Sequence, residues 1–328
     1  MSGVRPGVTR ATGLLVGFVA DRVLGDPARW HPVAGFGRGV SAVERRCYQP
    51  TRRRGTAFTA GVVTATGVAG WTVERLVRRR PALRVAATAV ATWAVLGGAS
   101  LLREASALAG QLAVEDLAAA REQVTHLVGR DPSRLDAAGI ARATVESLAE
   151  NTSDAVVAPL WWGAVAGVPG LLTYRAINTL DAMVGHRSER YVRFGWASAR
   201  LDDVVNLVPA RLTAALVALA APVVGGRPRT VLRVVRRDAG QHPSPNAGPV
   251  EAAVAGALDV TLGGVNVYHG VAEDRGALGD GPEPAVPDIA RTRRLVSVVS
   301  AAAAMVGAAI AVSAGHAGTP RRRRRRPS

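Results

Sequence analysis

The stretch AVVAPLWWGAVAGVPGLLTY, residues 155–174, decides the fold class, because it runs for twenty residues without a charged side chain. About 20 apolar residues are what a helix needs to cross the hydrocarbon core of a bilayer. Four further stretches are also uncharged, although the third is shorter: 55–73, 85–102, 212–226 and 295–315. The charges between them are bunched, as in polytopic membrane proteins. The sequence therefore predicts an all-α fold, a polytopic bundle of membrane helices.

Alanine and glycine dominate all five stretches, so a soluble all-α protein with buried helices stays open as the alternative. The N-terminus resembles a secretory signal, with Arg5 and Arg10 followed by apolar residues up to Asp21. No small-residue cleavage site follows the apolar run. We therefore expect a retained first helix, which would be a sixth membrane element.

The formal charge is +16, from 41 basic and 25 acidic residues, and every basic residue is arginine. Arginine clusters at 45–54, 75–84 and 291–294 abut predicted membrane helices. This placement favours anchoring on an anionic lipid membrane over nucleic acid as the partner. The run 321–326 is expected to be part of a disordered arginine tail, 319–328.

The cysteine and lysine content of the chain excludes several kinds of functional site. Cys47 is the only cysteine, which rules out an intramolecular disulfide and a cysteine-based zinc cluster. The absence of lysine rules out a Walker A motif and a lysine Schiff base.

No internal repeat is apparent, and the chain is interpreted as a single integral membrane domain over residues 1–328. Two polar regions interrupt it. The first, 103–150, is alanine-rich and charged, and is predicted to be a helical insertion exposed to water. The second, 231–292, holds most of the Pro and Gly punctuation and is predicted to be a loop-rich polar cap.

The segment ESLAENTSDAVVAP carries Glu146, Glu150 and Asp154 at four-residue steps. On a helix they share one face, where three carboxylates repel one another. A divalent metal with oxygen ligands is their natural partner. A solvated helix face with Asn151 or Ser153 as an incidental cap stays open as the alternative.

The next segment, YRAINTLDAMVGHR, places Arg175, Asn178 and Asp181 on one helix face, because they recur every three residues. A guanidinium, a carboxamide and a carboxylate in one row suit a phosphate and its metal ion. Polar residues within a membrane helix are functional by default. In a soluble protein they would more often form a structural network.

The segment FGWASARLDDVVNLVPAR repeats this arrangement with Arg200, Asp203 and Asn206, and adds Asp202 and Arg211. The adjacent aspartates are the sharpest metal signal in the chain, since an Asp pair beside a membrane helix has few structural reasons to exist. The alternative is a charge pair favoured by the positive end of a helix dipole.

The segment QHPSPNAGPVEAAVAG has two prolines that hold the chain extended before a predicted helix. Its loop would deliver His242, Ser244 and Asn246 to the helix N-terminus, a plausible anion site. An ordinary surface histidine is the alternative. Near the start of the chain, Asp26 and His31 belong to another turn-rich ionisable patch.

These segments, together with GDPARWHPV, LGGVNVYHG and LGDG, resemble the CobD/CbiB family from about residue 14 to about residue 311. The resemblance implies an adenosylcobinamide-phosphate synthase of cobalamin biosynthesis, a multi-pass protein of the cell membrane. It would form an amide bond between a propionate of adenosylcobyric acid, a corrinoid, and (R)-1-amino-2-propanol or its O-phosphate. The family is regarded as a ligase that requires ATP and a metal, here Mg²⁺.

A carboxylate must be activated before an amine attacks it, and developing phosphoryl charge calls for Mg²⁺ and arginine. Arg175, Arg200 and Arg211 are expected to hold phosphate or propionate, with Asn178, Asn206, Ser244 and Asn246 as further binding residues. The expected metal ligands are Glu150, Asp154, Asp181, Asp202 and Asp203. Asp154, Asp203 and His242 are the candidate catalytic residues, His242 as general base.

Two other functions are weighed. A membrane phosphoalcohol or prenyl transferase would also use clustered Asp and Mg²⁺, but its paired Asp-rich repeats are not found. A non-enzymatic transporter would show inverted repeats, and none is visible.

The order of the segments predicts an unusual topology. If residues 155–174 crossed the bilayer fully, Asp154 and Asp181 would lie on opposite sides and could not share a site. Pro159, Gly167 and other breakers interrupt the stretch. Irregular backbone at membrane depth is tolerated only where it lines a cavity in the protein. We therefore expect this stretch to be bent or re-entrant, with the polar segments converging on it.

Overall fold

The computed structural model confirms the all-α membrane fold. It describes residues 5–25, 32–128, 131–133, 135–186, 188–268 and 271–317. The arginine tail, Asp26 and His31 lie outside these residues.

The α-helices are α1 Pro6–Leu24, α2 Pro32–Cys47, α3 Arg52–Val77, α4 Pro81–Val95, α5 Gly98–Ala113, α6 Leu117–Val124, α7 Ala137–Thr152, α8 Ala158–Leu180, α9 Tyr191–Phe194, α10 Trp196–Ala220, α11 Pro228–Asp238, α12 Ala247–Leu258 and α13 Val286–Ala317. Two π-helical segments, η1 Ser153–Val157 and η2 Asp181–Gly185, flank α8, and two 3₁₀ turns are η3 Ala221–Val224 and η4 Ala239–Gln241. The strands β1 Leu262–Tyr268 and β2 Val271–Leu278 form one antiparallel hairpin.

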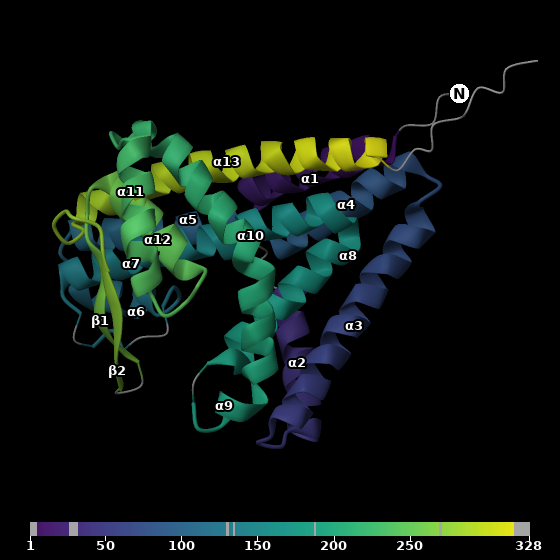
Figure 1. The fold of residues 1–328 in the computed structure, drawn as a ribbon, viewed down its shortest axis with the longest axis horizontal. Helices are drawn as coiled ribbons and strands as arrows, with labels where there is room; N and C mark the ends of the chain where they lie inside the picture. The colour runs from purple at the N-terminus through teal and green to yellow at the C-terminus, as the bar shows by residue number, and fades with distance from the viewer. Residues whose placement is uncertain are drawn as a thin grey trace, which may run out of the picture.

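The long helices pack in a layered bundle (Figure 1). α1 lies between α4 and α13, α8 packs against α3 and α4, and α3 runs obliquely along one side. The shorter helices α5, α7, α11 and α12 gather with the hairpin at one end of the molecule. α1 approaches α4 closely at Gly13 and Gly17, where an added Cβ would come within 2.5 Å of Thr88 and Thr92 side chains. Small residues allow such close packing between membrane helices.

Four helical stretches among the described residues are long and apolar enough to cross a membrane: Pro81–Ala113, Ala137–Gly185, Trp196–Val224 and Val286–Gly315. They contain four of the five predicted spans, which are therefore confirmed as membrane-compatible helices. The prediction for 55–73 is not supported. That stretch lies in α3, which is long enough, but frequent glycine and threonine dilute its apolar character.

The first polar region differs from its prediction. Its described part contains most of α5, all of α6 and most of α7, but α7 is mostly buried rather than exposed to water. It packs against α5, α12 and α13. The physical reason is that the small residues of α7 let neighbouring helices surround it, and its polar groups find partners inside the protein. Thr144, for example, donates to the carbonyl of Ile140 at 2.8 Å.

The second polar region, 231–292, is more regular than the predicted loop-rich cap. It contains most of α11, all of α12, the hairpin and the start of α13. Every residue of α12 is buried. Some of the Pro and Gly residues lie between these elements, as Pro243 and Pro282 do, but Gly256 and Gly276 lie within them. The two strands are a small exception to the helical prediction.

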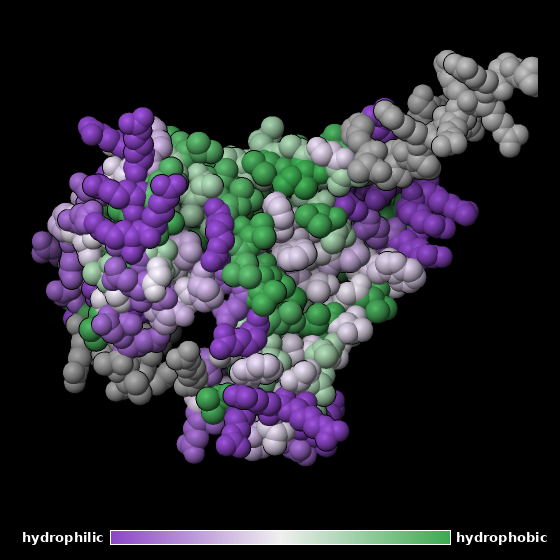
Figure 2. Space-filling model, viewed as in Figure 1, coloured by the Kyte–Doolittle hydropathy of each residue, from purple (hydrophilic) through white to green (hydrophobic). Residues whose placement is uncertain are grey.

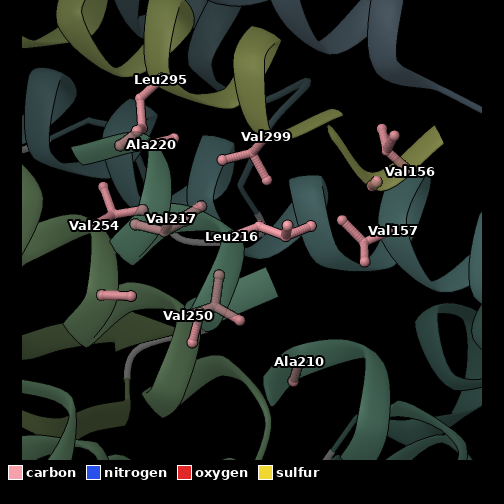
Figure 3. Packing of buried hydrophobic residues seen from close by; sticks show 14 of the residues in the cluster. Val156, Val157, Ala210, Leu216, Val217, Ala220, Val250, Val254, Leu295 and Val299 are labelled. Carbon is pink, nitrogen blue, oxygen red and sulfur yellow. The ribbon is translucent and has the colours of Figure 1, made fainter. Parts of the chain in front are cut away.

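A core of small aliphatic side chains lies where α10, α12, α13 and η1 meet (Figure 3). Val157 from η1, Val217 from α10 and Val250 from α12 belong to it, and all three are almost completely buried. Val250 also lines the cavity described next. The core therefore fixes the elements that carry the polar groups of the site.

Candidate functional site

The predicted polar segments meet at a cavity of about 230 Å³. Its lining comes from α7, η1, η2, α10 and the N-terminal end of α12. The acidic lining residues are Glu150, Asp154, Asp181, Asp202 and Asp203, and the others are Ser153, Asn206, Ser244, Asn246, Ala247 and Val250. None of these described lining residues is basic. All five predicted metal ligands thus share one cavity.

The cavity forms because α8 is a re-entrant helical hairpin. At Gly167 the backbone takes φ 67° and ψ −146°, which ends one helical limb and begins another. The two limbs pack tightly: a Cβ on Gly170 would meet the carbonyl oxygen of Trp162 at 2.2 Å, and one on Gly163 would meet Leu171 at 2.8 Å. The bend predicted for residues 155–174 is confirmed, and it returns Asp181 to the level of Asp154.

Side chains from three other helices hold the tip of this hairpin. Arg10 of α1 donates to the carbonyls of Ala164 and Val165 at 3.1 and 3.0 Å. Glu74 of α3 accepts a hydrogen bond from the Val168 amide at 3.2 Å. Arg84 of α4 and Arg10 pair with Glu74 at 2.8 and 3.3 Å. The backbone groups freed by the break therefore have charged partners, as buried backbone requires.

Asp154 and Asp181 lie in the π-helical segments at the two ends of α8. A π-helical turn contains an extra residue and is frequently found at functional sites. It rotates the following side chains relative to a regular helix. Glu146 lies one turn before Glu150 on the regular helix α7 and does not line the cavity. Its carboxylate instead accepts a hydrogen bond from the Gly263 amide of β1 at 2.9 Å.

Hydrogen bonds connect the hairpin to α10. Tyr174 donates both to the carbonyl of Asp154 at 3.1 Å and to the amide oxygen of Asn206 at 2.9 Å. Asn206 in turn donates to Oδ2 of Asp202 at 2.9 Å. Asn178 donates to Asp154 at 3.5 Å. The sequence analysis did not predict that Tyr174 belongs to this network. The only signal for it in the sequence is its position next to Arg175.

The loop between η4 and α12 closes another side of the cavity. Asn246 donates to the carbonyl of Asp203 at 2.8 Å, which ties this loop to α10. Ser244 accepts hydrogen bonds from the amides of Asn246 and Ala247 and so caps α12. The helix begins at Ala247.

His242 does not line the cavity. Its Nδ1 accepts a hydrogen bond from the Ser244 amide at 3.0 Å, and its Nε2 lies 3.6 Å from the carboxylate of the fully buried Glu251. Burial, reinforced by the positive charge of Arg275, lowers the pKa of His242 to about 4. The imidazole is therefore neutral near pH 7.

The three predicted arginines surround the cavity without lining it. Arg175 donates to Asn178 at 3.3 Å, Arg200 pairs with Asp203 at 3.5 Å, and Arg211 donates to Asn246 at 3.0 Å. Asp203 and Asn246 line the cavity, and Asn178 donates a hydrogen bond to the lining residue Asp154. Their predicted role in holding phosphate or propionate stays a prediction.

The lining fits a magnesium ion. Oδ1 of Asp202 and Oγ of Ser153 are buried without a hydrogen-bond partner. Within the described ranges, no three His, Cys, Asp or Glu side chains stand close enough to hold a metal as they are. Mg²⁺ is bound through one or two carboxylates and keeps several waters, so it does not require a preformed cage. Oxygen ligands and the two open oxygen atoms match this ion.

Fold and cavity together define a helical membrane protein with an acidic site at the base of a re-entrant hairpin. The family model described as CobD/Cbib protein matches residues 14–296, and the chain belongs to this family. The resemblance seen in the sequence is confirmed.

Three relatives, each named cobalamin biosynthesis protein CobD, show the extent of the similarity. The Mycobacterium tuberculosis protein is 53% identical over 91% of this chain and 95% of its own length. That of Chromobacterium violaceum is 45% identical over 93% and 98%, and that of Rhodobacter capsulatus 44% over 86% and 90%. No solved structure matches the chain.

Proposed function

We propose that the protein is an enzyme of cobalamin biosynthesis and a multi-pass protein of the cell membrane. In this proposal it joins (R)-1-amino-2-propanol, or its O-phosphate, to a propionate of adenosylcobyric acid in an ATP-dependent reaction. One observation carries the proposal: the five carboxylates that the sequence spreads over three segments line one cavity without a basic residue among the described lining. Such a cavity attracts cations, and both the amine and Mg²⁺ are cations.

The size of the cavity supports different positions for the two substrates in this proposal. About 230 Å³ is below the usual range of 300–1,000 Å³ for ligand pockets. It holds a small amine or the end of a side chain, but not a corrinoid ring. The ring would rest outside, and only one propionate arm would reach the carboxylates.

The five acidic residues would hold Mg²⁺, beginning with Asp202, whose Oδ1 is open. When bound, the ion offsets carboxylate repulsion and stabilises charge on phosphoryl oxygens. At the start of α12, the carboxamide of Asn246 lines the cavity and would contact a bound phosphate in this proposal. Arg211 is close enough to support this side through Asn246.

Amide formation requires an activated carboxylate and an unprotonated amine. Activation transfers a phosphoryl group from ATP to a propionate oxygen, which then leaves as phosphate when nitrogen attacks the carbonyl carbon. The ammonium loses one proton before attack and a second as the amide forms. Oxygens of the acidic lining residues are the acceptors nearest to an amine in the cavity.

His242 has a different role in this proposal from the general base expected of it. Its nitrogens contact the Ser244 backbone and Glu251, and the ring itself does not line the cavity. It is a positioning residue: the ring accepts the Ser244 amide and so fixes the loop that carries Ser244 and Asn246 to the cavity.

The proposal is tested with purified protein, adenosylcobyric acid, aminopropanol or its phosphate, ATP and Mg²⁺, and the product is identified by mass. Reactions without ATP or without Mg²⁺ are the first controls. Product that forms only in the complete mixture, with ADP released in equal amount, is the expected result. No amide product with either amine, or product independent of ATP, would refute the proposed reaction.

A further inference from the structure

α11 presents a row of arginines on its exposed side. Val231 and Val234 are buried against α12, so the opposite side of the helix faces outward. Arg229, Arg233 and Arg236 are all exposed there, at steps of four and three residues, which places them on one face.

These arginines are not neutralised within the protein. Within the part of the chain that the structure describes, no acidic side chain pairs with Arg229, Arg233 or Arg236. Their neighbour Arg237 shows the contrast, since it binds Asp238 at 2.6 Å and Asp280 at 2.7 Å. The row is therefore a concentrated positive charge available to an external anion.

An apolar side chain lies within the same surface. Leu232 is 44% exposed, and together with Arg229, Arg233, Arg236 and Arg237 it lines a shallow hollow of about 470 Å³. A leucine among arginines suits a ligand that is anionic at one end and apolar at the other. A free phosphate would use only the arginines.

The helix is placed where a bilayer surface would be. It begins at Pro228, shortly after the membrane-compatible stretch Trp196–Val224 ends. Arg291, in the first turns of the stretch Val286–Gly315, donates to the carbonyl of Val224 at 3.0 Å, so the ends of both stretches meet beside it. In Figure 2 a hydrophilic cluster covers the place where Figure 1 shows α11, and it borders apolar surface.

We propose that α11 is an interfacial helix that binds the phosphate headgroups of anionic lipids through Arg229, Arg233 and Arg236, with Leu232 at the start of the acyl chains. Because the apolar face of α11 packs against α12, the arginines supply most of the attraction to anionic headgroups. The site is separate from the acidic cavity, and its test does not depend on the proposed reaction.

The experiment uses the full chain purified in a mild detergent. Phosphatidylglycerol is titrated against phosphatidylcholine, and lipid retained on the protein is measured by native mass spectrometry, with thermal stability as a second readout. The triple variant Arg229→Gln, Arg233→Gln, Arg236→Gln is expected to bind phosphatidylglycerol roughly a hundredfold more weakly, at roughly fivefold per arginine. The matched variant with lysine at all three positions keeps the charge and is expected to retain most of the binding.

Two results would overturn the proposal. One is equal retention of phosphatidylglycerol by the wild type and the glutamine variant. The other is an equal gain in stability from inorganic phosphate at matched ionic strength, which would assign the site to a free anion. If the triple variant does not fold, Arg229→Gln and Arg236→Gln are measured singly, and the absence of a loss in both contradicts the proposal.

Discussion

The two ends of the α8 hairpin both place charged groups inside an apolar protein, but they differ in how those charges are satisfied. At the tip, Glu74 lies between Arg10 and Arg84 and also accepts the Val168 amide. At the base, five carboxylates line a cavity whose described lining includes no basic side chain. Charge that is paired and bonded to backbone stabilises a shape, whereas charge left to share a cavity requires an external cation. The tip is therefore structural, and the base is the candidate active site.

The largest expected effect is at the base. Asp202→Asn keeps the size of the side chain and its bond with Asn206, but removes a charged oxygen from the cavity. We expect turnover to fall by about 100-fold or more at saturating Mg²⁺, because a ligand of the activating ion is lost. Asp154→Asn is expected to behave in the same way. The rate of amide formation measures both.

The control for this experiment is Asp116→Asn, the same chemical change at the exposed cap of α6, where the side chain accepts from the Ala119 amide. It should leave turnover unchanged. Unfolding in detergent should show that Asp202→Asn stays folded. Normal turnover in both cavity variants would show that the base of the hairpin is not the active site.

The second effect is at the tip. Glu74→Gln leaves Arg10 and Arg84 without their shared carboxylate, and we expect unfolding to become easier by about 2 kcal/mol, less than for a fully buried pair. Turnover per folded molecule should remain near the wild-type value at low temperature. Glu122→Gln, at an exposed position of α6, is the control.

Thermal unfolding and turnover are measured on the same sample of this variant. A structural tip predicts lower thermal stability with normal chemistry. Lost turnover at unchanged stability would mean instead that the tip takes part in the reaction, and the comparison would fail.

The third effect concerns His242, beside the base. Burial and Arg275 lower its pKa to about 4, below the value of about 6.5 for an unfolded histidine. Because the folded state prefers the neutral ring, this contribution to stability is complete above pH 6.5 and is lost as pH falls towards 4. The loss is at most about 3 kcal/mol.

His242→Gln should remove this part of the pH dependence, as measured by unfolding at pH 4.5 and 7.5. Turnover near neutral pH should change less than tenfold, since the ring is not in the cavity lining. A fall of several hundredfold in turnover with unchanged affinity for the amine would restore the general-base role.

The smallest effect on catalysis is expected from the arginines outside both ends of the hairpin. Deleting residues 321–326 removes six arginines but touches no segment of the site. Catalysis in detergent should be intact, while attraction to anionic vesicles weakens by on the order of 1 kcal/mol per arginine near the surface. Reduced turnover in detergent, where no lipid surface operates, would contradict this expectation.

Some of these features were determined by the sequence alone. Long uncharged runs predicted the membrane helices, because the bilayer sets a minimum apolar length. The order of the polar segments around residues 155–174 predicted the re-entrant bend, since Asp154 and Asp181 could share a site in no other way. Residue types alone indicated the acidic, metal-compatible chemistry.

Other features were decided only by the tertiary structure. Glu146 and Glu150 are one turn apart on the regular helix α7, yet Glu146 accepts from β1 while Glu150 lines the cavity, because different elements pack beside them. The burial of His242 against Glu251, and the tip network of Arg10, Glu74 and Arg84, join residues far apart in the chain. The amino-acid sequence shows which side chains are charged, but which of them pair depends on which helices pack together.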